Sequence, residues 1–201
     1  MSGGERSALR RQLRQARRAL SPLQQRKASQ QLLRQLAQHP LYRRSKHIAF
    51  YLANDGEINP EPLLQHAHRL GKQCYLPVLC EWPTNRMHFQ RLQTNQRWTL
   101  NRFGIREPVY NRGLQTKPWR LDLILMPLVG FDEHGNRLGM GGGFYDRTFA
   151  FRRRWQHGSG PRLLGLAHDC QKVNQLPTAP WDIPLDGIVS DQQFILLPSQ
   201  G

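Results

Sequence analysis

Glycines are concentrated between residues 139 and 143, just ahead of a carboxylate. Gly139, Gly141, Gly142 and Gly143 fill four of five consecutive positions, and Asp146 follows. Glycines allow positive φ angles and close approach of a ligand to the backbone, and consecutive N–H groups can form an anion-binding nest. A helix that begins after the loop would add partial positive charge. The loop therefore predicts a polyphosphate site, and the alternative is a tight glycine turn without a ligand.

This loop departs from two familiar phosphate-binding motifs. It lacks the Lys-Ser/Thr pair of G-x-x-x-x-G-K-[ST], and Phe144 stands where the dinucleotide motif ends in Gly or Ala. Asp146 falls in the first turn of the expected helix, where an acid can simply complement the helix dipole. Beside bound phosphates the same carboxylate suits Mg²⁺, and Asp186 is a weaker candidate for a second oxygen ligand. These residues predict phosphate handling, and they leave the reaction open.

Positive charge is concentrated near the N-terminus. The formal net charge is +15, and residues 1–47 hold twelve Lys and Arg against the single acid Glu5. Apolar residues recur at helical spacing over 5–20, and Arg6 and Arg10, four apart, share another face of that helix. Such an arm suits an anionic partner, which could be a nucleic acid, a membrane surface or a phosphorylated metabolite. The alternative is a solvated basic helix. No helix-turn-helix, RNP or zinc-finger pattern supports nucleic-acid binding.

Helical and strand patterns alternate along the 201 residues, which predicts one α/β domain with a mainly parallel sheet. Ser21-Pro22 with Gln24 forms a capping box that opens a helix to about residue 38. Other helices are expected from 59 to 70 and from 144 to about Trp155. We expect strands at 47–52, 73–79, 87–92, 121–129, 162–168, 187–190 and 194–197. Residues 93–120 show no sustained period, and we interpret them as connecting structure.

Glu57 follows the predicted strand at 47–52. In a parallel sheet, ligands bind in the loops after the carboxyl ends of strands, so Glu57 is a candidate for ligand binding. The alternative is an ordinary surface carboxylate. Cys74, Cys80 and Cys170 are odd in number and lack C-x-x-C spacing, which indicates a reducing compartment. With no signal-peptide pattern and no apolar run of membrane-spanning length, we expect a cytoplasmic protein that does not bind membranes.

The glycine loop is part of a longer motif. It reads Phe131-Asp132-x-x-Gly135-Asn136-Arg137-Leu138-Gly139-x-Gly141-x-Gly143-Phe144-Tyr145-Asp146. This motif closely resembles the signature of the 5-formyltetrahydrofolate cyclo-ligase family, also called methenyltetrahydrofolate synthetase. The resemblance covers nearly the whole chain. It includes Arg6-x-x-x-Arg10, the segments Phe50-Tyr51-Leu52 and Gly56-Glu57-Ile58, Tyr75-Leu76-Pro77, and Trp181-Asp182-Ile183-Pro184-Leu185-Asp186.

The resemblance implies an enzyme that closes the ring of 5-formyltetrahydrofolate to 5,10-methenyltetrahydrofolate, with ATP and Mg²⁺ and with release of ADP and phosphate. It implies a three-layer α/β sandwich related to the sugar-phosphate isomerase and CoA-transferase group. We expect a monomer that accepts the folate, with or without a polyglutamate tail. A sugar-phosphate isomerase of similar fold is an alternative, and ATP dependence separates the two.

The resemblance also implies site residues by position. For ATP these are Arg6, Arg10, Arg137, Leu138, Gly139, Met140, Gly141, Gly142, Gly143, Phe144 and Tyr145. For the folate they are Leu52, Glu57, Met140, Gly141, Gly142, Gly143 and Phe144. Asp146 and Asp186 would hold Mg²⁺, and Arg137, Tyr145 and Asp146 would take part in catalysis. The family often has Lys in place of Arg6 and Tyr in place of Phe144, so we interpret Phe144 as a stacking or packing residue.

Overall fold

A computed structural model of the chain describes residues 3–80, 86–153 and 160–197. The helices are α1 (Gly3–Arg18), α2 (Pro22–Gln38), α3 (Pro40–Arg44), α4 (Glu61–Arg69) and α5 (Phe144–Thr148), with 3-10 turns η1 (Arg112–Leu114), η2 (Pro118–Arg120), η3 (Ala150–Arg153) and η4 (Asp169–Gln171). The strands are β1 (His47–Ala49), β2 (Gln73–Leu79), β3 (Met87–Arg91), β4 (Trp98–Leu100), β5 (Arg106–Pro108), β6 (Gln115–Thr116), β7 (Leu123–Pro127), β8 (Gly130–Phe131), β9 (Arg137–Leu138), β10 (Arg162–Leu166), β11 (Gly187–Val189) and β12 (Phe194–Leu196).

The described residues form a central eight-stranded sheet with the order β12-β11-β10-β7-β1-β2-β3-β6. Strands β11, β10, β7, β1 and β2 run parallel to one another. Antiparallel pairs complete the two edges: β12 pairs with β11 at one edge, and β3 pairs with β2 and β6 with β3 at the other. Two small hairpins, β4–β5 and β8–β9, lie outside this sheet. The predicted α/β class with a mainly parallel sheet is confirmed.

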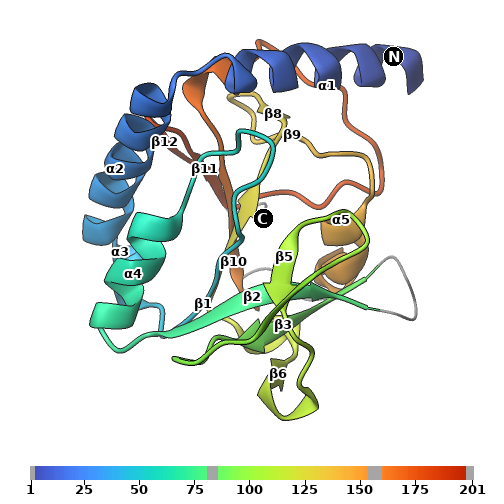
Figure 1. Cartoon of the computed structure of the whole chain (residues 1–201). Coiled ribbons are helices and arrows are strands. Elements are labelled where there is room, and N and C mark those ends of the chain that lie inside the picture. Colours follow the sequence, from blue (N-terminus) through green and yellow to red (C-terminus); the bar gives the residue numbers. More distant parts are fainter. Residues whose placement is uncertain (1–2, 81–85, 154–159, 198–201) are drawn as a thin grey trace.

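Helices and turns cover both faces of the sheet, which makes three layers (Figure 1). On one face, Leu36 of α2 and Leu63 of α4 are fully buried against alternate residues of the central strands. On the other face, Phe149 at the end of α5 and Ile183 pack against the intervening residues. Strand β7 has the sequence Leu-Ile-Leu-Met-Pro, and this continuous apolar run suits a central strand whose side chains are buried on both faces of the sheet.

The chain changes direction across the sheet between the neighbouring strands β1 and β7. From β1 it passes through α4 to β2 on one side, and from β7 it passes through α5 to β10 on the other side. Such a switch point opens a crevice at the carboxyl ends of the two strands. Helix α1 lies across this edge, where Leu13 packs with Val129, Leu138 and Leu176 (Figure 1). The topology therefore predicts a ligand site beside α1.

Local sequence signals predicted several elements well. The Ser21 capping box is present at α2, and β2 spans the expected residues. The long helix expected after the glycine loop is wrong: α5 ends at Thr148 and the 3-10 turn η3 follows, while Trp155 lies outside the described residues. Residues 93–120 are also more regular than predicted, since they contain β4, β5 and β6. No helix in the described part of the chain is long and apolar enough to cross a membrane.

Candidate active site

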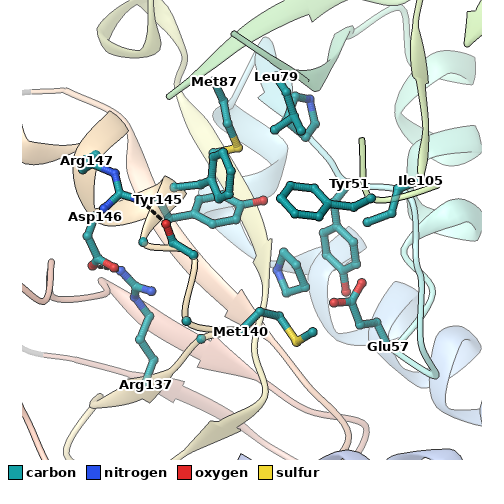
Figure 2. A pocket seen from close by; sticks show the side chains of 18 of the residues that line it. Tyr51, Glu57, Leu79, Met87, Ile105, Arg137, Met140, Tyr145, Asp146 and Arg147 are labelled. Carbon is teal, nitrogen blue, oxygen red and sulfur yellow. Dashed lines mark hydrogen bonds and ion pairs between the residues drawn. The ribbon is translucent and has the colours of Figure 1, made fainter. Parts of the chain in front are cut away.

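A cavity of about 800 Å³ opens at the carboxyl ends of the central strands. Its walls come from α1, the segment after β1, strand β2, the β4–β5 hairpin, the glycine loop and α5. Figure 2 shows Arg137 and Asp146 on one side of the cavity, Glu57 and Tyr51 on the other, and the Tyr145 hydroxyl pointing between them. One space thus joins the basic and acidic candidates that the sequence placed far apart.

The first half of the long motif builds the support of the glycine loop. Asp132 is fully buried, and its carboxylate accepts hydrogen bonds from the backbone N–H groups of His134 (3.0 Å), Asn136 (3.0 Å) and Leu176 (2.8 Å). The Asn136 side-chain amide donates to the same carboxylate at 2.9 Å. These bonds close the β8–β9 hairpin and tie it to a distant segment. These hydrogen bonds give a structural role to Asp132 and Asn136, motif residues that do not line the cavity.

The second half of the motif, residues 139–143, forms a wall of the cavity. Gly141 and Gly143 have φ angles of 99° and 62°, which L side chains rarely adopt. The Gly139 carbonyl accepts a hydrogen bond from Arg10 Nε at 2.8 Å, so α1 holds the loop from outside. Arg147 donates to the Gly142 carbonyl. Positive φ is therefore a requirement of this loop.

Three arginines direct positive charge at this wall. Arg137 forms an ion pair with Asp146, which also accepts a hydrogen bond from the Ile183 N–H at 3.0 Å. Arg6 forms an ion pair with Asp182 at 3.4 Å. Burial and the adjacent charge of Arg6 lower the pKa of Arg10. Because the like charges of Arg6 and Arg10 lie on successive turns of α1, binding of an anion between them would relieve their repulsion.

Glu57 lies on the opposite side of the cavity and is largely buried, with 11% of its side chain exposed. One carboxylate oxygen accepts a hydrogen bond from the Asn54 N–H at 3.1 Å. Burial raises the pKa of Glu57 to about 7, although Arg17 opposes that shift. Tyr51 is held by a 2.6 Å bond to the Ile58 carbonyl. Burial raises the pKa of Tyr145, so its hydroxyl remains protonated and can donate a hydrogen bond.

Most residues that the sequence singled out line this cavity. They are Arg6, Arg10, Leu52, Glu57, Arg137, Gly139, Met140, Gly141, Gly142, Gly143, Phe144, Tyr145 and Asp146. Phe144, interpreted as a stacking or packing residue, packs edge-on against Phe103, at 5.8 Å between ring centroids. Arg14, which follows Arg10 by one helical turn, binds Asp55 at 2.7 Å and is not among the lining residues.

Leu138 and Asp186 do not line the cavity. Leu138 is fully buried against α1, because an apolar side chain on the inner face of the β8–β9 hairpin packs into the core. Asp186 precedes β11, and so lies at the amino ends of the parallel strands, opposite the carboxyl ends that form the cavity. Its carboxylate binds Arg152 (3.0 Å) and Arg162 (2.9 Å). Asp186 and Asp146 therefore differ in position and in their arginine partners.

Sequence reasoning missed several lining residues. Phe103 and Ile105 belong to the turn of the β4–β5 hairpin, which lies in the stretch interpreted as connecting structure. The usable signal was the Asn101 to Gly104 turn between two short β-prone runs, with Gly104 at a φ of 71°. Asp182 belongs to the segment 181–186 that carries the resemblance, but its pairing with Arg6, 176 residues earlier in the chain, had no local signal.

Asp146 lines the cavity directly after the glycine loop, and its carboxylate could hold a divalent cation there. Both of its hydrogen bonds go to Oδ1. No group of three or more His, Cys, Asp or Glu side chains with metal-binding geometry occurs within residues 3–80, 86–153 and 160–197. A protein site of this composition fits Mg²⁺, which takes one or two carboxylates and completes its shell with phosphate oxygens and water.

Comparison with known proteins identifies the family. The model of the 5-formyltetrahydrofolate cyclo-ligase family matches residues 2–191. The chain belongs to this family. The 5-formyltetrahydrofolate cyclo-ligase of Escherichia coli K12 is 41% identical over 178 residues, which cover 89% of this chain and 96% of that protein. The Haemophilus influenzae protein of the same name is 40% identical, over 94% of this chain and 99% of its own.

Solved structures of family members share the fold. The 5,10-methenyltetrahydrofolate synthetase of Aquifex aeolicus superposes with a TM-score of 0.80 at 30% identity, over 98% of this chain and 94% of that one. The Mycoplasma pneumoniae synthetase gives a TM-score of 0.70 at 26% identity, over 92% of this chain and 98% of its own. The cyclo-ligase family consists of ligases, so this chain is an enzyme of the ligase class.

Proposed function

We propose that this cyclo-ligase family member converts 5-formyltetrahydrofolate to 5,10-methenyltetrahydrofolate, with ATP as the phosphoryl donor and with ADP and phosphate as the other products. The observation that carries the proposal is the single cavity of about 800 Å³ that joins the glycine loop and arginines to Glu57. Two substrates that must react with each other need one shared space. The names of the relatives supply the folate and the direction of the reaction.

The triphosphate would bind between α1 and the glycine loop. Arg6, Arg10 and Arg137 supply positive charge, and the backbone N–H groups of residues 139–143 supply hydrogen-bond donors. Arg6 and Arg137 are paired with Asp182 and Asp146. On ATP binding, phosphate oxygens would replace these two carboxylates as the partners of Arg6 and Arg137, because they carry more negative charge.

Mg²⁺ would be held by Asp146, once Arg137 turns to a phosphate. The ion supplies charge neutralisation on the triphosphate. Asp146 itself is held in place by the Ile183 N–H, so its carboxylate stays at the cavity wall when Arg137 moves. Asp186, bound to two arginines outside the lining, has no part in this proposal.

The folate would bind on the other side of the cavity. Glu57 can accept hydrogen bonds from the N–H groups of the pterin ring, and Leu52, Met140 and Phe144 offer apolar contact. Arg106 and Arg153 also line the cavity and suit the anionic glutamate tail. Affinity for a polyglutamylated folate that does not fall with salt would argue against a role for these two arginines.

The chemistry follows from the substrate. An N-formyl group is an amide, and its oxygen is a poor leaving group. The formyl oxygen attacks the γ-phosphorus in line, the bond to the bridging oxygen of ADP breaks, and an iminium phosphate forms. N10 of the same folate then attacks the activated carbon, and the C–O bond to phosphate breaks as the ring closes with loss of the N10 proton. Positioning and charge neutralisation dominate catalysis of this kind.

Two catalytic side chains fit that scheme. Arg137 lines the cavity beside Asp146 and would neutralise the charge that moves onto the phosphoryl oxygens. Tyr145 has a protonated hydroxyl that points between the two halves of the cavity and can donate a hydrogen bond to the transferred group (Figure 2). We further propose a cytoplasmic enzyme, because Cys74, Cys80 and Cys170 are free thiols, as in a reducing compartment. That the enzyme is a monomer stays a prediction.

The decisive experiment mixes the purified protein, 5-formyltetrahydrofolate, ATP and Mg²⁺ and follows the absorbance of the methenyl product. We expect product only when ATP is present. Absence of an ATP-dependent signal would overturn the proposal.

An electrophoretic shift assay with RNA or DNA tests the nucleic-acid alternative at physiological salt, where a merely electrostatic interaction weakens.

A further inference from the structure

Arg17 is a fully buried arginine that the proposed chemistry does not use. Its Nε donates to the Asp55 carbonyl (2.8 Å), its Nη2 to the Asp55 carboxylate (2.9 Å) and its Nη1 to the Leu128 carbonyl (3.2 Å). Nη2 also lies 3.8 Å from Glu57 Oε1. One guanidinium therefore joins α1 to the segments that follow β1 and β7, at the switch point of the sheet.

The turn that carries Glu57 is packed directly on α1. Asp55 has a φ angle of 54°, an uncommon conformation for a residue with a side chain, and Gly56 follows at 75°. A Cβ atom on Gly56 would lie 3.3 Å from the Arg17 carbonyl oxygen and 3.5 Å from Arg18 Cα. The turn thus approaches the α1 backbone as closely as a glycine allows.

Asp55 is clamped by three arginines of α1. Its carboxylate binds Arg14 (2.7 Å), Arg17 (2.9 Å) and Arg18. Burial alone would raise the pKa of Asp55, but the hydrogen bonds from these arginines outweigh it and lower that pKa to about 2. Asp55 is therefore ionised at every pH of interest, and it holds the turn to the helix.

Glu57 faces a small set of charged and titratable groups, and Arg17 is the most important of those that favour its charged form. Arg14 acts in the same direction, and Asp55 acts against it. Tyr51 and Tyr145 also lie close and are neutral, because burial raises the pKa of each. The remaining groups near the turn are His168, whose pKa burial lowers, and Asp191 beside it.

We propose that Arg17 is a positioning residue of this enzyme, which fixes the Glu57 carboxylate against α1 for binding the pterin ring. The inference rests on the proposed function, because it assumes that Glu57 binds the folate. It assigns α1 two tasks: Arg6 and Arg10 face the nucleotide half of the cavity, and Arg17 supports the folate half. Arg17 itself does not line the cavity and acts only through its neighbours.

The test compares Arg17→Met with Arg18→Met by measuring kcat/KM for 5-formyltetrahydrofolate from pH 5.5 to 9. Both changes remove one charged partner of Asp55, but Arg18 is half exposed and is not among the groups that set the charge of Glu57. We expect Arg17→Met to move the acid limb upward by about one pH unit, which is about a five-fold loss at pH 7. The KM for ATP should change less than two-fold. Arg18→Met should keep the wild-type profile.

Two further variants keep the inference testable if Arg17→Met does not fold. Arg17→Lys retains the charge but cannot span the Asp55 carboxylate, the Leu128 carbonyl and Glu57 together, so we expect a smaller rise in KM for the folate alone. In a Glu57→Gln background, Arg17→Lys should cause no further rise. A wild-type acid limb and folate KM in Arg17→Lys, or an undiminished effect when Glu57 is Gln, would overturn the role of Arg17. A wild-type enzyme without ATP-dependent product would instead overturn the proposed function.

Discussion

Replacement of Glu57 by Gln should make the protein more stable at alkaline pH while it weakens the folate site. The folded-state pKa of Glu57 is about 7, above the ordinary value of 4.5, chiefly because the carboxyl group is buried. The folded state therefore binds this proton more tightly than the unfolded state does. Because the folded state holds the proton more tightly, ionisation of Glu57 lowers the free energy of unfolding progressively as pH rises from about 4.5 through 7.

The magnitude follows from the two pKa values. At 1.36 kcal/mol for each tenfold change in proton affinity, ionisation of Glu57 costs about 1 kcal/mol of folding stability at pH 5 and about 3 kcal/mol at pH 8. Gln is nearly isosteric and can still accept the hydrogen bond from the Asn54 N–H. Glu57→Gln should thus relieve a cost that grows with pH and leave the packing intact.

Urea unfolding of the wild type and Glu57→Gln at pH 5 and pH 8 measures this difference. We expect the variant to gain about 2 kcal/mol more at pH 8 than at pH 5, and we expect its KM for the folate to rise far more than its KM for ATP. An equal change in stability at both pH values would refute the electrostatic reasoning. Equal losses of folate and ATP binding would remove Glu57 from the pterin site.

Three other changes probe the remaining parts of the site. Asp146→Ala should raise the Mg²⁺ concentration needed for half-maximal activity and lower kcat sharply, with an unchanged circular dichroism spectrum; unchanged Mg²⁺ dependence would exclude Asp146 as a metal ligand. Gly56→Ala should cost about 2 kcal/mol in denaturant unfolding, because strain at positive φ adds to the contact with the Arg17 carbonyl, whereas Gly71→Ala, at a φ of 70° with open space around its Cβ, should cost about 1 kcal/mol. Equal costs for the two glycines would contradict the packing argument. Arg10→Gln should raise the KM for ATP about ten-fold and spare the folate, because a charge-assisted contact with phosphate is lost; a parallel loss of folate binding would argue that Arg10 acts mainly through the loop at Gly139.

The sequence predicted those cavity-lining residues that stand out by residue type and by spacing to near neighbours in the chain. The glycine loop, Asp146 and the paired Arg6 and Arg10 all stand out by residue type and spacing, and each lines the cavity. Glu57 stands out because it follows a buried strand, and a parallel sheet gathers such positions at one edge. Asp186 does not line the cavity, because it precedes its strand and so lies at the other edge of the sheet.

The sequence alone determined most elements, the α/β class and the family, because caps, apolar periods and the long motif each depend on residues close together in the chain. The contact partners of the site residues depend on the tertiary structure. In the folded chain Arg14, Arg17 and Arg18 bind Asp55, and Leu138 is buried under α1. The β4–β5 hairpin and Asp182 line the cavity. These contacts join residues 37 to 176 positions apart, and only the packing of α1 across the carboxyl edge of the sheet brings them together.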